Sequence, residues 1–191
     1  GVGLIDVFAT AKDGKVYTAA TGPQTNGKWA GWWPVGQGTL LPGTPIAAVS
    51  RSQGRIDLFA IGLDQRVWSA AYGPVSPSEW GWVGWFAILD EKFVPGAIVS
   101  AVSRKLDQLD VFAVNLNGEV KTAAWAPGAN NGKWGGWWRI TDSNGKFAPG
   151  TPIAAVHRSP DHLDVFAVGL DGSVWSAAWG PQTNHKWAGW W

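Results

Sequence analysis

The sequence predicts an all-β protein, a β-propeller built from about four blades of four strands each. The first observation is a string Asp-(Val/Leu)-Phe-Ala that recurs at spacings of 51, 53 and 54 residues, starting at Asp6, Asp57, Asp110 and Asp164. The second is a string Trp-x-Gly-Trp-(Trp/Phe) that keeps nearly the same period, with its middle Trp at Trp32, Trp85, Trp137 and Trp190. A repeat of about 50 residues made of short strands is typical of propeller blades.

Each repeat reads as four strands joined by tight turns. Residues 45–51 form an apolar run rich in small side chains, and residues 56–61 alternate about Asp57 and Phe59. A turn at 63–65 leads to residues 67–72, and the sister turns carry the hairpin dipeptides Asp13-Gly14, Asn117-Gly118 and Asp171-Gly172. A loop rich in Gly, Pro and Asn precedes the Trp-rich fourth strand. No segment shows the apolar spacing of an amphipathic helix.

The order of strands within a blade follows from side-chain size. Blades converge on a central axis, so we expect the small-residue strand to be innermost and the Trp strand outermost. The chain then holds 15 strands, and the first blade lacks its inner strand because only residues 1–4 precede the first Ile5-Asp6. We expect a single repeat array over residues 1–191, with repeats at about 3–55, 56–108, 109–162 and 163–191.

An incomplete first blade leaves apolar faces and backbone exposed unless something covers them. We therefore expect the repeats to form part of a larger ring, completed by self-association or by a longer natural array. The alternative is a monomeric four-bladed ring with one three-stranded blade. The start at Gly1, without Met and between two strands of a repeat, suggests a natural or engineered fragment.

Composition excludes several functional classes. Charged residues make up 15% of the 191 residues, and 15 basic side chains face 14 acidic ones, for a net charge of +1. A chain this close to neutral lacks the excess of positive charge that binding to nucleic acid or to an anionic membrane surface requires. With 0 Cys the chain has no disulfide and no thiolate metal site, and no apolar run is long enough to span a bilayer. Low charge and aromatic faces are compatible with secretion.

The 16 tryptophans sort into columns when the repeats are aligned. Three columns belong to the outer strand, and we expect them to fill the contacts between blades, where large aromatic area is useful. The first column holds Trp29, Trp82, Trp134 and Trp187. The second holds Trp32, Trp85, Trp137 and Trp190. The third holds Trp33, Phe86, Trp138 and Trp191.

Two columns of the third strand vary between aromatic and polar residues, as a set of intact and decayed ligand sites would. They run Tyr17, Trp68, Lys121, Trp175 and Thr21, Tyr72, Trp125, Trp179. A spacing of four places both columns on one face of a strand. Aromatic platforms beside amides and hydroxyls suit neutral sugars, so the candidate sugar-binding residues are Tyr17, Trp68, Tyr72, Trp125, Trp175 and Trp179, with the loop amides Asn26, Asn131 and Asn184. Turn chemistry alone also explains these asparagines.

An arginine ends the small-residue strand in three repeats, six residues before the aspartate of the next strand. These residues are Arg51, Arg104 and Arg158. A recurrent Arg–Asp pair across a hairpin is usually a structural clamp. The arginines are also candidate sugar-binding residues, because a guanidinium donates paired hydrogen bonds to polar ligands.

No motif supports catalysis. His157, His162 and His185 are absent from the sister repeats and match no metal signature. No nucleophile elbow or phosphate loop occurs, and a pair of carboxylates meeting in space as in a glycosidase has no positive support. We therefore predict a protein that is not an enzyme and has no metal or cofactor.

Three strings resemble repeats of tryptophan-rich, lectin-like β-propellers, a group that includes seven-bladed fucose-binding bacterial lectins. The strings are residues 109–114, 174–179 and 134–138. The resemblance covers nearly the whole chain and implies sugar sites between adjacent blades. Two hypotheses follow: a multivalent carbohydrate-binding module for a fucose-like or other neutral sugar, and a propeller fragment whose property is self-assembly.

Overall fold

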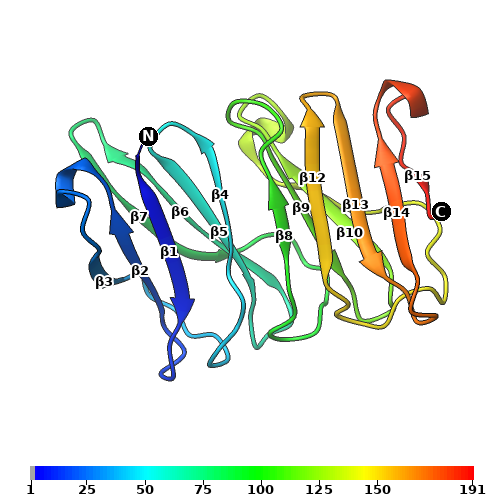
Figure 1. Cartoon of the computed structure of the whole chain (residues 1–191), viewed down its shortest axis with the longest axis horizontal. Helices are drawn as coiled ribbons and strands as arrows, with labels where there is room; N and C mark the ends of the chain where they lie inside the picture. Colours follow the sequence, from blue (N-terminus) through cyan, green and yellow to red (C-terminus); the bar gives the residue numbers. More distant parts are fainter. Residues whose placement is uncertain (1–2) are drawn as a thin grey trace.

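The structure, a computed structural model, describes residues 3–191 and contains 15 β-strands in four antiparallel sheets. Figure 1 shows the four sheets side by side, with the first and last at opposite ends of the molecule. Three short 3₁₀ turns, η1 (Pro23–Thr25), η2 (Asn130–Gly132) and η3 (Pro181–Thr183), interrupt the loops before the last strand of a blade. The prediction of an all-β fold is confirmed, and residues 3–191 contain no α-helix.

The strands follow the predicted order. The first blade holds β1 (Ile5–Thr10), β2 (Val16–Thr21) and β3 (Ala30–Pro34), and the second holds β4 (Ala47–Ser52), β5 (Arg55–Ile61), β6 (Val67–Ser76) and β7 (Glu79–Ala87). The third holds β8 (Ser100–Val102), β9 (Leu109–Val114), β10 (Val120–Trp125) and β11 (Gly135–Arg139). The fourth holds β12 (Ile153–Ser159), β13 (His162–Val168), β14 (Val174–Trp179) and β15 (Ala188–Gly189). The first blade has three strands, as predicted.

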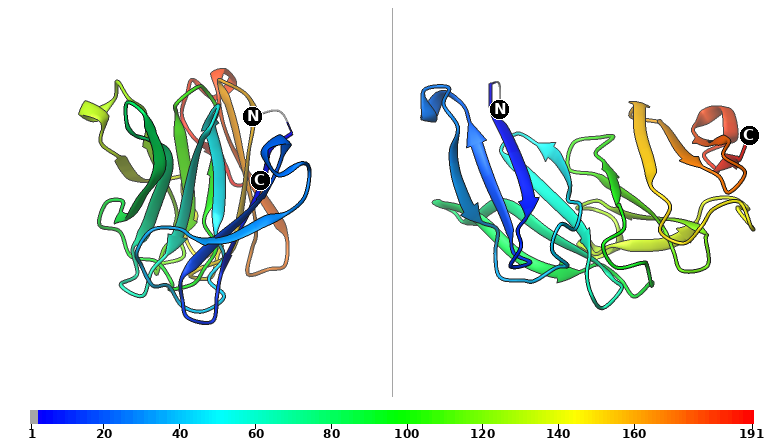
Figure 2. Two further views of the ribbon diagram at one scale, coloured as in Figure 1. Left: turned by 90° about the vertical axis from the view of Figure 1, so that its left-hand side faces the viewer. Right: turned by 60° about the horizontal axis from the view of Figure 1, so that its bottom comes forward.

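The small-residue strands are the inner ones. β4 lies beside β8, and β8 lies beside β12, so these strands meet across neighbouring blades. Figure 2 (right) shows the sheets following a curve whose two ends stay apart. The described chain is therefore an open arc of four propeller blades, which removes the alternative of a closed four-bladed ring.

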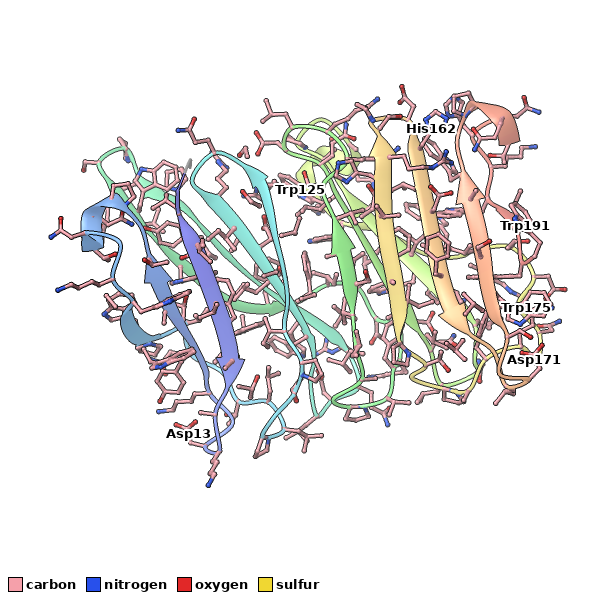
Figure 3. All side chains as sticks on the ribbon, in the orientation of Figure 1. Asp13, Trp125, His162, Asp171, Trp175 and Trp191 are labelled. Atoms are coloured by element: carbon pink, nitrogen blue, oxygen red, sulfur yellow. The ribbon has the colours of Figure 1, made fainter. Side chains whose placement is uncertain are left out.

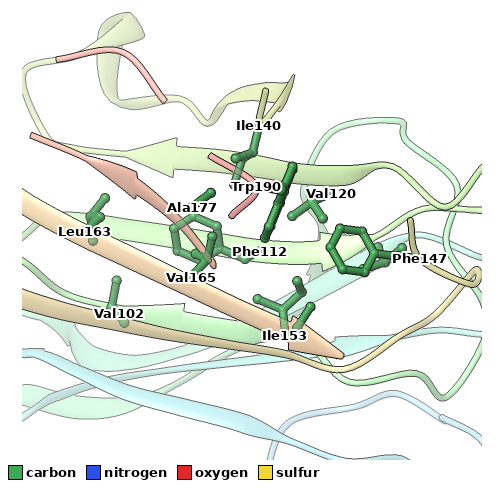
Figure 4. Close-up of a cluster of buried hydrophobic side chains, with 12 residues drawn as sticks. Val102, Phe112, Val120, Ile140, Phe147, Ile153, Leu163, Val165, Ala177 and Trp190 are labelled. Atoms are coloured by element: carbon green, nitrogen blue, oxygen red, sulfur yellow. The ribbon is translucent and has the colours of Figure 1, made fainter. Parts of the chain in front are cut away.

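The hydrophobic core lies between the blades rather than within them. One cluster joins the third and fourth blades through Phe112, Val114, Val165 and Ala167, with Trp190 against its side (Figure 4). Two further clusters join the second blade to the third and the first blade to the second. Each blade is stabilised by its neighbours, because a single sheet has two apolar faces and no core of its own.

One aromatic contact recurs at every junction. The phenylalanine of the second strand meets the first-column tryptophan of the next blade edge to face, with ring centroids 5.7–5.8 Å apart and interplanar angles of 84–88°. The pairs are Phe8–Trp82, Phe59–Trp134 and Phe112–Trp187. This geometry places the positive ring edge against the negative ring face. The predicted packing role of the first column is confirmed at these three junctions.

The second column also packs between blades. The ring centroids of Trp137 and Phe93, a residue of the preceding interblade loop, are 4.8 Å apart. The ring centroids of Trp190 and Phe147 are separated by the same distance. The Trp85 indole nitrogen donates a hydrogen bond to the Val35 carbonyl oxygen at 3.0 Å, and that of Trp137 donates to Ile88 at 3.4 Å. Trp137 thus uses both its ring and its N–H at the junction, whereas the Trp190 indole nitrogen is buried without a hydrogen-bond partner in the described residues.

The predicted packing role is wrong for the third column, because all four of its residues are exposed: Trp33, Phe86, Trp138 and Trp191. Consecutive residues of a strand point to opposite faces, and the neighbouring blade does not reach the outer end of the face that carries this column. Adjacent tryptophans of one strand therefore have different environments.

Trp137→Ala should lower the free energy of unfolding by about 3 kcal/mol, because it removes the Phe93 contact and leaves a cavity between blades. Trp138→Ala is the matched control, since Trp138 is 53% exposed, and it should cost less than about 1 kcal/mol. Urea unfolding followed by circular dichroism measures both. Equal losses from the two substitutions would contradict this account of the junction.

Candidate functional site

The candidate aromatic residues share one face of the third strand, as predicted, but the two columns lie at opposite ends of it. In the second to fourth blades this face looks toward the preceding blade. We call the end with the hairpins between second and third strands the lower rim, and the other end the upper rim. Figure 3 shows Asp13, Asp171 and Trp175 at the lower rim and Trp125 at the upper rim. The two predicted columns therefore lie at two different rims of the blades.

An aspartate at the hairpin fixes each aromatic side chain of the lower rim. The Trp68 indole nitrogen donates to Asp64 Oδ1 at 2.9 Å, and that of Trp175 donates to Asp171 Oδ1 at 3.2 Å. Tyr17 donates its hydroxyl hydrogen to Asp13 Oδ2 at 3.1 Å. Each aspartate lies four residues before its aromatic partner, on the turn that reverses the chain. The ring plane is thereby held in one orientation without any ligand.

A cavity of about 340 Å³ opens over Trp68 at the junction of the first and second blades. Trp68 and Trp85 provide its aromatic walls, and the loop after the first blade contributes the Gln37 amide and the Thr39 hydroxyl. Asp64 lines the same cavity. This volume lies near the lower end of the range of small-molecule sites, and the combination of apolar walls with a few polar groups is typical of them.

Burial raises the pKa of the Asp64 carboxyl, but hydrogen bonds from Trp68 and Arg66 outweigh it and hold the pKa below its ordinary value. The Arg66 guanidinium nitrogen Nε lies 2.6 Å from Asp64 Oδ2 and its central carbon lies 5.6 Å from the Trp68 ring centroid. The carboxylate is therefore ionised at neutral pH and its charge is balanced locally. A neutral ligand fits this balance better than an ion.

The equivalent positions at the other two junctions are filled by lysine side chains. Lys146 places its ammonium nitrogen 3.5 Å from the centroid of the Trp175 ring, where Thr39 stands in the first junction. Lys121 replaces the aromatic residue in the third blade and pairs with Glu119 at 3.1 Å. Trp175 and Lys121 are thus engaged by the protein itself, and the cavity over Trp68 is open.

The upper rim carries the arginines, and each pairs with the aspartate six residues later. Arg51 Nη1 lies 3.1 Å from Asp57 Oδ1, and Arg104 Nε lies 2.8 Å from Asp110 Oδ2. Arg158 pairs with Asp164 in the same way, although the Arg158 side chain is 58% exposed. The geometry is that of a clamp between the inner and second strands, as the spacing predicts.

Two of these arginines also reach across the junction to an aromatic ring of the next blade. The guanidinium carbon of Arg51 lies 4.9 Å from the Trp125 ring centroid, and that of Arg104 lies 4.6 Å from the Trp179 centroid. The indole N–H groups donate to loop carbonyls, Trp125 to Gly132 and Trp179 to His185, each at 2.8 Å. Each upper-rim cluster therefore combines a cation, a carboxylate and a fixed aromatic face.

Burial raises the pKa of Asp57 to about 6, and this effect outweighs the opposing charge of Arg51. The same cause raises the pKa of Asp110 against the charge of Arg104. Asp57 Oδ2 and Arg51 Nε are buried atoms without a hydrogen-bond partner in the described residues. Asp107 also lies beside this clamp, with its Oδ1 3.6 Å from Arg51 Nε.

Tyr72 and the three loop asparagines lie outside the clusters described above. Tyr72 tilts against Trp80 and Trp82, with centroids 6.2 and 5.4 Å away. Asn26, Asn131 and Asn184 are exposed and adopt φ of 51°, 55° and 53°, the left-handed conformation that asparagine tolerates in turns. Their backbone geometry supports the turn explanation of these residues.

Within residues 3–191, no three His, Cys, Asp or Glu side chains are grouped so that they could hold a metal ion. The described part of the chain has no helix long and apolar enough to cross a membrane.

Sequence reasoning missed three residues of the lower-rim cavity. The sequence shows Asp64 only as part of the turn at 63–65, and Gln37 and Thr39 belong to a loop whose position depends on the next blade. A signal for Asp64 existed: Asp lies four residues before Tyr or Trp in three of the four hairpins. Nothing in the sequence indicated which loop would cover which ring.

No protein-family model and no curated protein matches the sequence. Among solved structures, the BP39L lectin from Burkholderia pseudomallei superposes with a TM-score of 0.79 at 27% identity, covering 97% of this chain and 51% of that one. The fucose-specific lectin of Aleuria aurantia, a six-bladed β-propeller, gives 0.72 at 19% identity over 97% and 55%. An ulvan lyase, a polysaccharide lyase, gives 0.61 at 13% over 98% and 51%.

These neighbours identify the class of fold. The chain spans about half the length of the structures it matches, and its four blades superpose on part of a lectin propeller. The predicted likeness to lectin-like β-propellers is confirmed.

Proposed function

We propose that this chain is a carbohydrate-binding, lectin-like propeller that takes a fucose-like or other neutral sugar at repeated weak sites between its blades. The observation that carries the proposal is the cavity over Trp68, where a fixed indole face lies beside an amide, a hydroxyl and a carboxylate. The C–H face of a pyranose packs on an aromatic ring, and its hydroxyls need directional donors and acceptors. Two solved neighbours are lectins that recognise fucose or a fucoside: the Aleuria aurantia lectin, with a fucose recognition mode, and the SapL1 lectin, in complex with α-methyl fucoside.

The upper rim offers a second set of sites in this proposal. Trp125 with Arg51 and Trp179 with Arg104 each combine an aromatic face with guanidinium donors at a junction. Tyr17, Tyr72, Arg158 and the three loop asparagines would contribute weaker or incomplete sites, and Trp175 would contribute none because Lys146 covers its ring. Several weak sites on one molecule increase the overall affinity for a multivalent glycan surface.

We further propose that the chain has no catalytic activity. Many of its carboxylates are engaged in clamps, in hairpin hydrogen bonds or in ion pairs, as Asp57, Asp64 and Asp161 illustrate. The lectins among the neighbours support this proposal, and the polysaccharide lyase makes an assay for polysaccharide cleavage its direct test.

Trp68→Ala should weaken binding of methyl α-L-fucoside about tenfold, because the stacking platform is lost while the surrounding strands remain. Isothermal titration calorimetry measures the affinity, with methyl mannoside and methyl galactoside as alternative sugars. Trp175→Ala is the matched control: it removes the same residue type at the same place in the fourth blade, where Lys146 covers the ring. Its affinity should equal that of the unchanged protein.

If the unchanged protein bound none of the three sugars, the result would contradict the proposal. Equal losses from Trp68→Ala and Trp175→Ala would contradict the assignment of the site to the first junction.

Self-association is a second candidate property, and the two ends of the arc favour it. Phe166 of the fourth blade is 39% exposed and Trp29 of the first is 56% exposed. Phe166 and Trp29 occupy the same repeat positions as the Phe and the Trp of the edge-to-face contact that joins neighbouring blades inside the chain. We propose that copies associate head to tail through these residues, which makes a heterologous contact.

Light scattering after size exclusion tests this association. The mass should rise above 20.4 kDa with concentration and return to that value in the Phe166→Ala variant. A mass of 20.4 kDa at every concentration would refute it.

A further inference from the structure

Arg51 lies between two carboxylates that belong to different blades. Its Nη1 is 3.1 Å from Asp57 Oδ1 in the second blade, and its Nε is 3.6 Å from Asp107 Oδ1 in the third. The Asp57 side chain is 3% exposed, whereas that of Asp107 is 33% exposed. One guanidinium thus faces a buried acid of its own blade and a partly solvated acid of the next blade.

Asp107 holds the second and third blades together through further contacts. Its main-chain N–H donates a hydrogen bond to the Arg51 carbonyl oxygen at 3.1 Å, and its Oδ1 accepts one from the Ser52 hydroxyl at 3.0 Å. The Arg51 guanidinium also lies against the ring of Trp125, a residue of the third blade. Arg51 Nε, the atom that faces Asp107, is buried and has no hydrogen-bond partner within residues 3–191. A small shift of Arg51 toward Asp107 would satisfy this nitrogen and add an ion pair across the junction.

The surroundings of Asp57 disfavour a charge on its side chain. β5 is a middle strand of its sheet, and Asp57 lies there opposite Val49 of β4 and Ala71 of β6. Asp57 Oδ2 is buried and has no hydrogen-bond partner in the described part of the chain. An ionised carboxylate loses its hydration in such a place, and a single contact with an arginine replaces that hydration only in part. The neutral form of Asp57 is therefore favoured.

Burial has the largest effect on the pKa of Asp57 and raises it to about 6. The charged groups that face this carboxyl are Arg51 and Arg55 of the second blade, which lower the pKa, and Asp107 of the third blade, which raises it. Uptake of a proton by Asp57 leaves Asp107 as the anionic partner of Arg51. One proton can therefore select between two pairings of the same guanidinium.

We propose that this cluster is an acid-sensitive latch: when Asp57 takes up a proton, Arg51 moves its charge pairing from Asp57 to Asp107 and binds the second blade more tightly to the third. The proton comes from solvent and stays on Asp57, and no other covalent bond forms or breaks. Above the transition the guanidinium is held within its own blade, and below the transition it bridges two blades. The latch does not depend on the proposed sugar binding.

The sign of the effect on stability follows from the direction of the pKa change. A carboxyl whose pKa is higher in the folded chain than in the unfolded chain stabilises the folded state at low pH, and this stabilisation is lost as the pH rises through the folded-state value. Asp57 has a pKa of about 6 in the folded chain, against an ordinary value of 3.8. The unfolding equilibrium constant should therefore fall about tenfold between about pH 7.5 and about pH 5.

Asp57→Asn replaces the titrating carboxyl by a neutral group of the same shape. Urea unfolding followed by circular dichroism should show that this variant lacks the tenfold change between the two pH values. Asp164→Asn is the matched control, because Asp164 pairs with Arg158 at the same repeat position but faces no further blade among the described residues. The control variant should keep the full tenfold change.

Hydrogen exchange at the Asp107 amide measures the latch itself. This N–H bonds to the Arg51 carbonyl oxygen across the junction, so its protection, corrected for the intrinsic pH dependence of exchange, should rise several-fold at about pH 5. Asp107→Asn removes the second anionic partner and keeps a residue that tolerates the local φ of 54°. The rise in protection should be absent from this variant.

An equal pH dependence of unfolding in the unchanged chain and in Asp57→Asn would overturn the proposal, because Asp57 would then not be the titrating group. Constant protection of the Asp107 amide, or a rise that persists in Asp107→Asn, would overturn it as well, since Arg51 would then not move toward Asp107. If Asp57→Asn does not fold, the two hydrogen-exchange results decide for or against the latch.

Discussion

The edge-to-face contact between a phenylalanine of one blade and a tryptophan of the next is the interaction on which the rest of the structure depends. A blade of three or four strands has two apolar faces, and neither can be buried within the blade itself. The pairs Phe8–Trp82, Phe59–Trp134 and Phe112–Trp187 fix the spacing and angle of successive blades. The cavity over Trp68 and the clusters of Arg51 with Trp125 and Arg104 with Trp179 each lie at a junction that one of these pairs defines.

Because the three junctions share the same packing contacts, the positions at which they differ are the ones that indicate ligand sites. The lower rim has a cavity over Trp68, a lysine over Trp175 and a lysine in place of the aromatic residue at Lys121. The scaffold contacts are the same in all three cases, so these changes cost the fold little. Variation confined to one face of one strand, beside constant packing residues, is what a set of ligand sites of different quality requires.

The sequence predicted the architecture well because each blade repeats its own pattern. Asp57 and Phe59 marked the second strand, the small residues marked the inner strand, and the lack of residues before Ile5 indicated the three-stranded first blade. The exposure of Trp138 beside the packed Trp137 was not predictable, because it depends on how far the neighbouring blade extends. The separation of Trp68 from Trp125 into two rims was missed for a related reason: strand periodicity gives the face of a residue but not the loop that meets it.

A crystal structure of the chain soaked with methyl α-L-fucoside tests most directly whether the junctions between blades are the functional sites. The account predicts density for the sugar ring stacked on Trp68, with its hydroxyls toward Asp64, Gln37 and Thr39. Sugar density over the exposed outer column, for example on Trp33 or Trp138, with the junctions empty would contradict it.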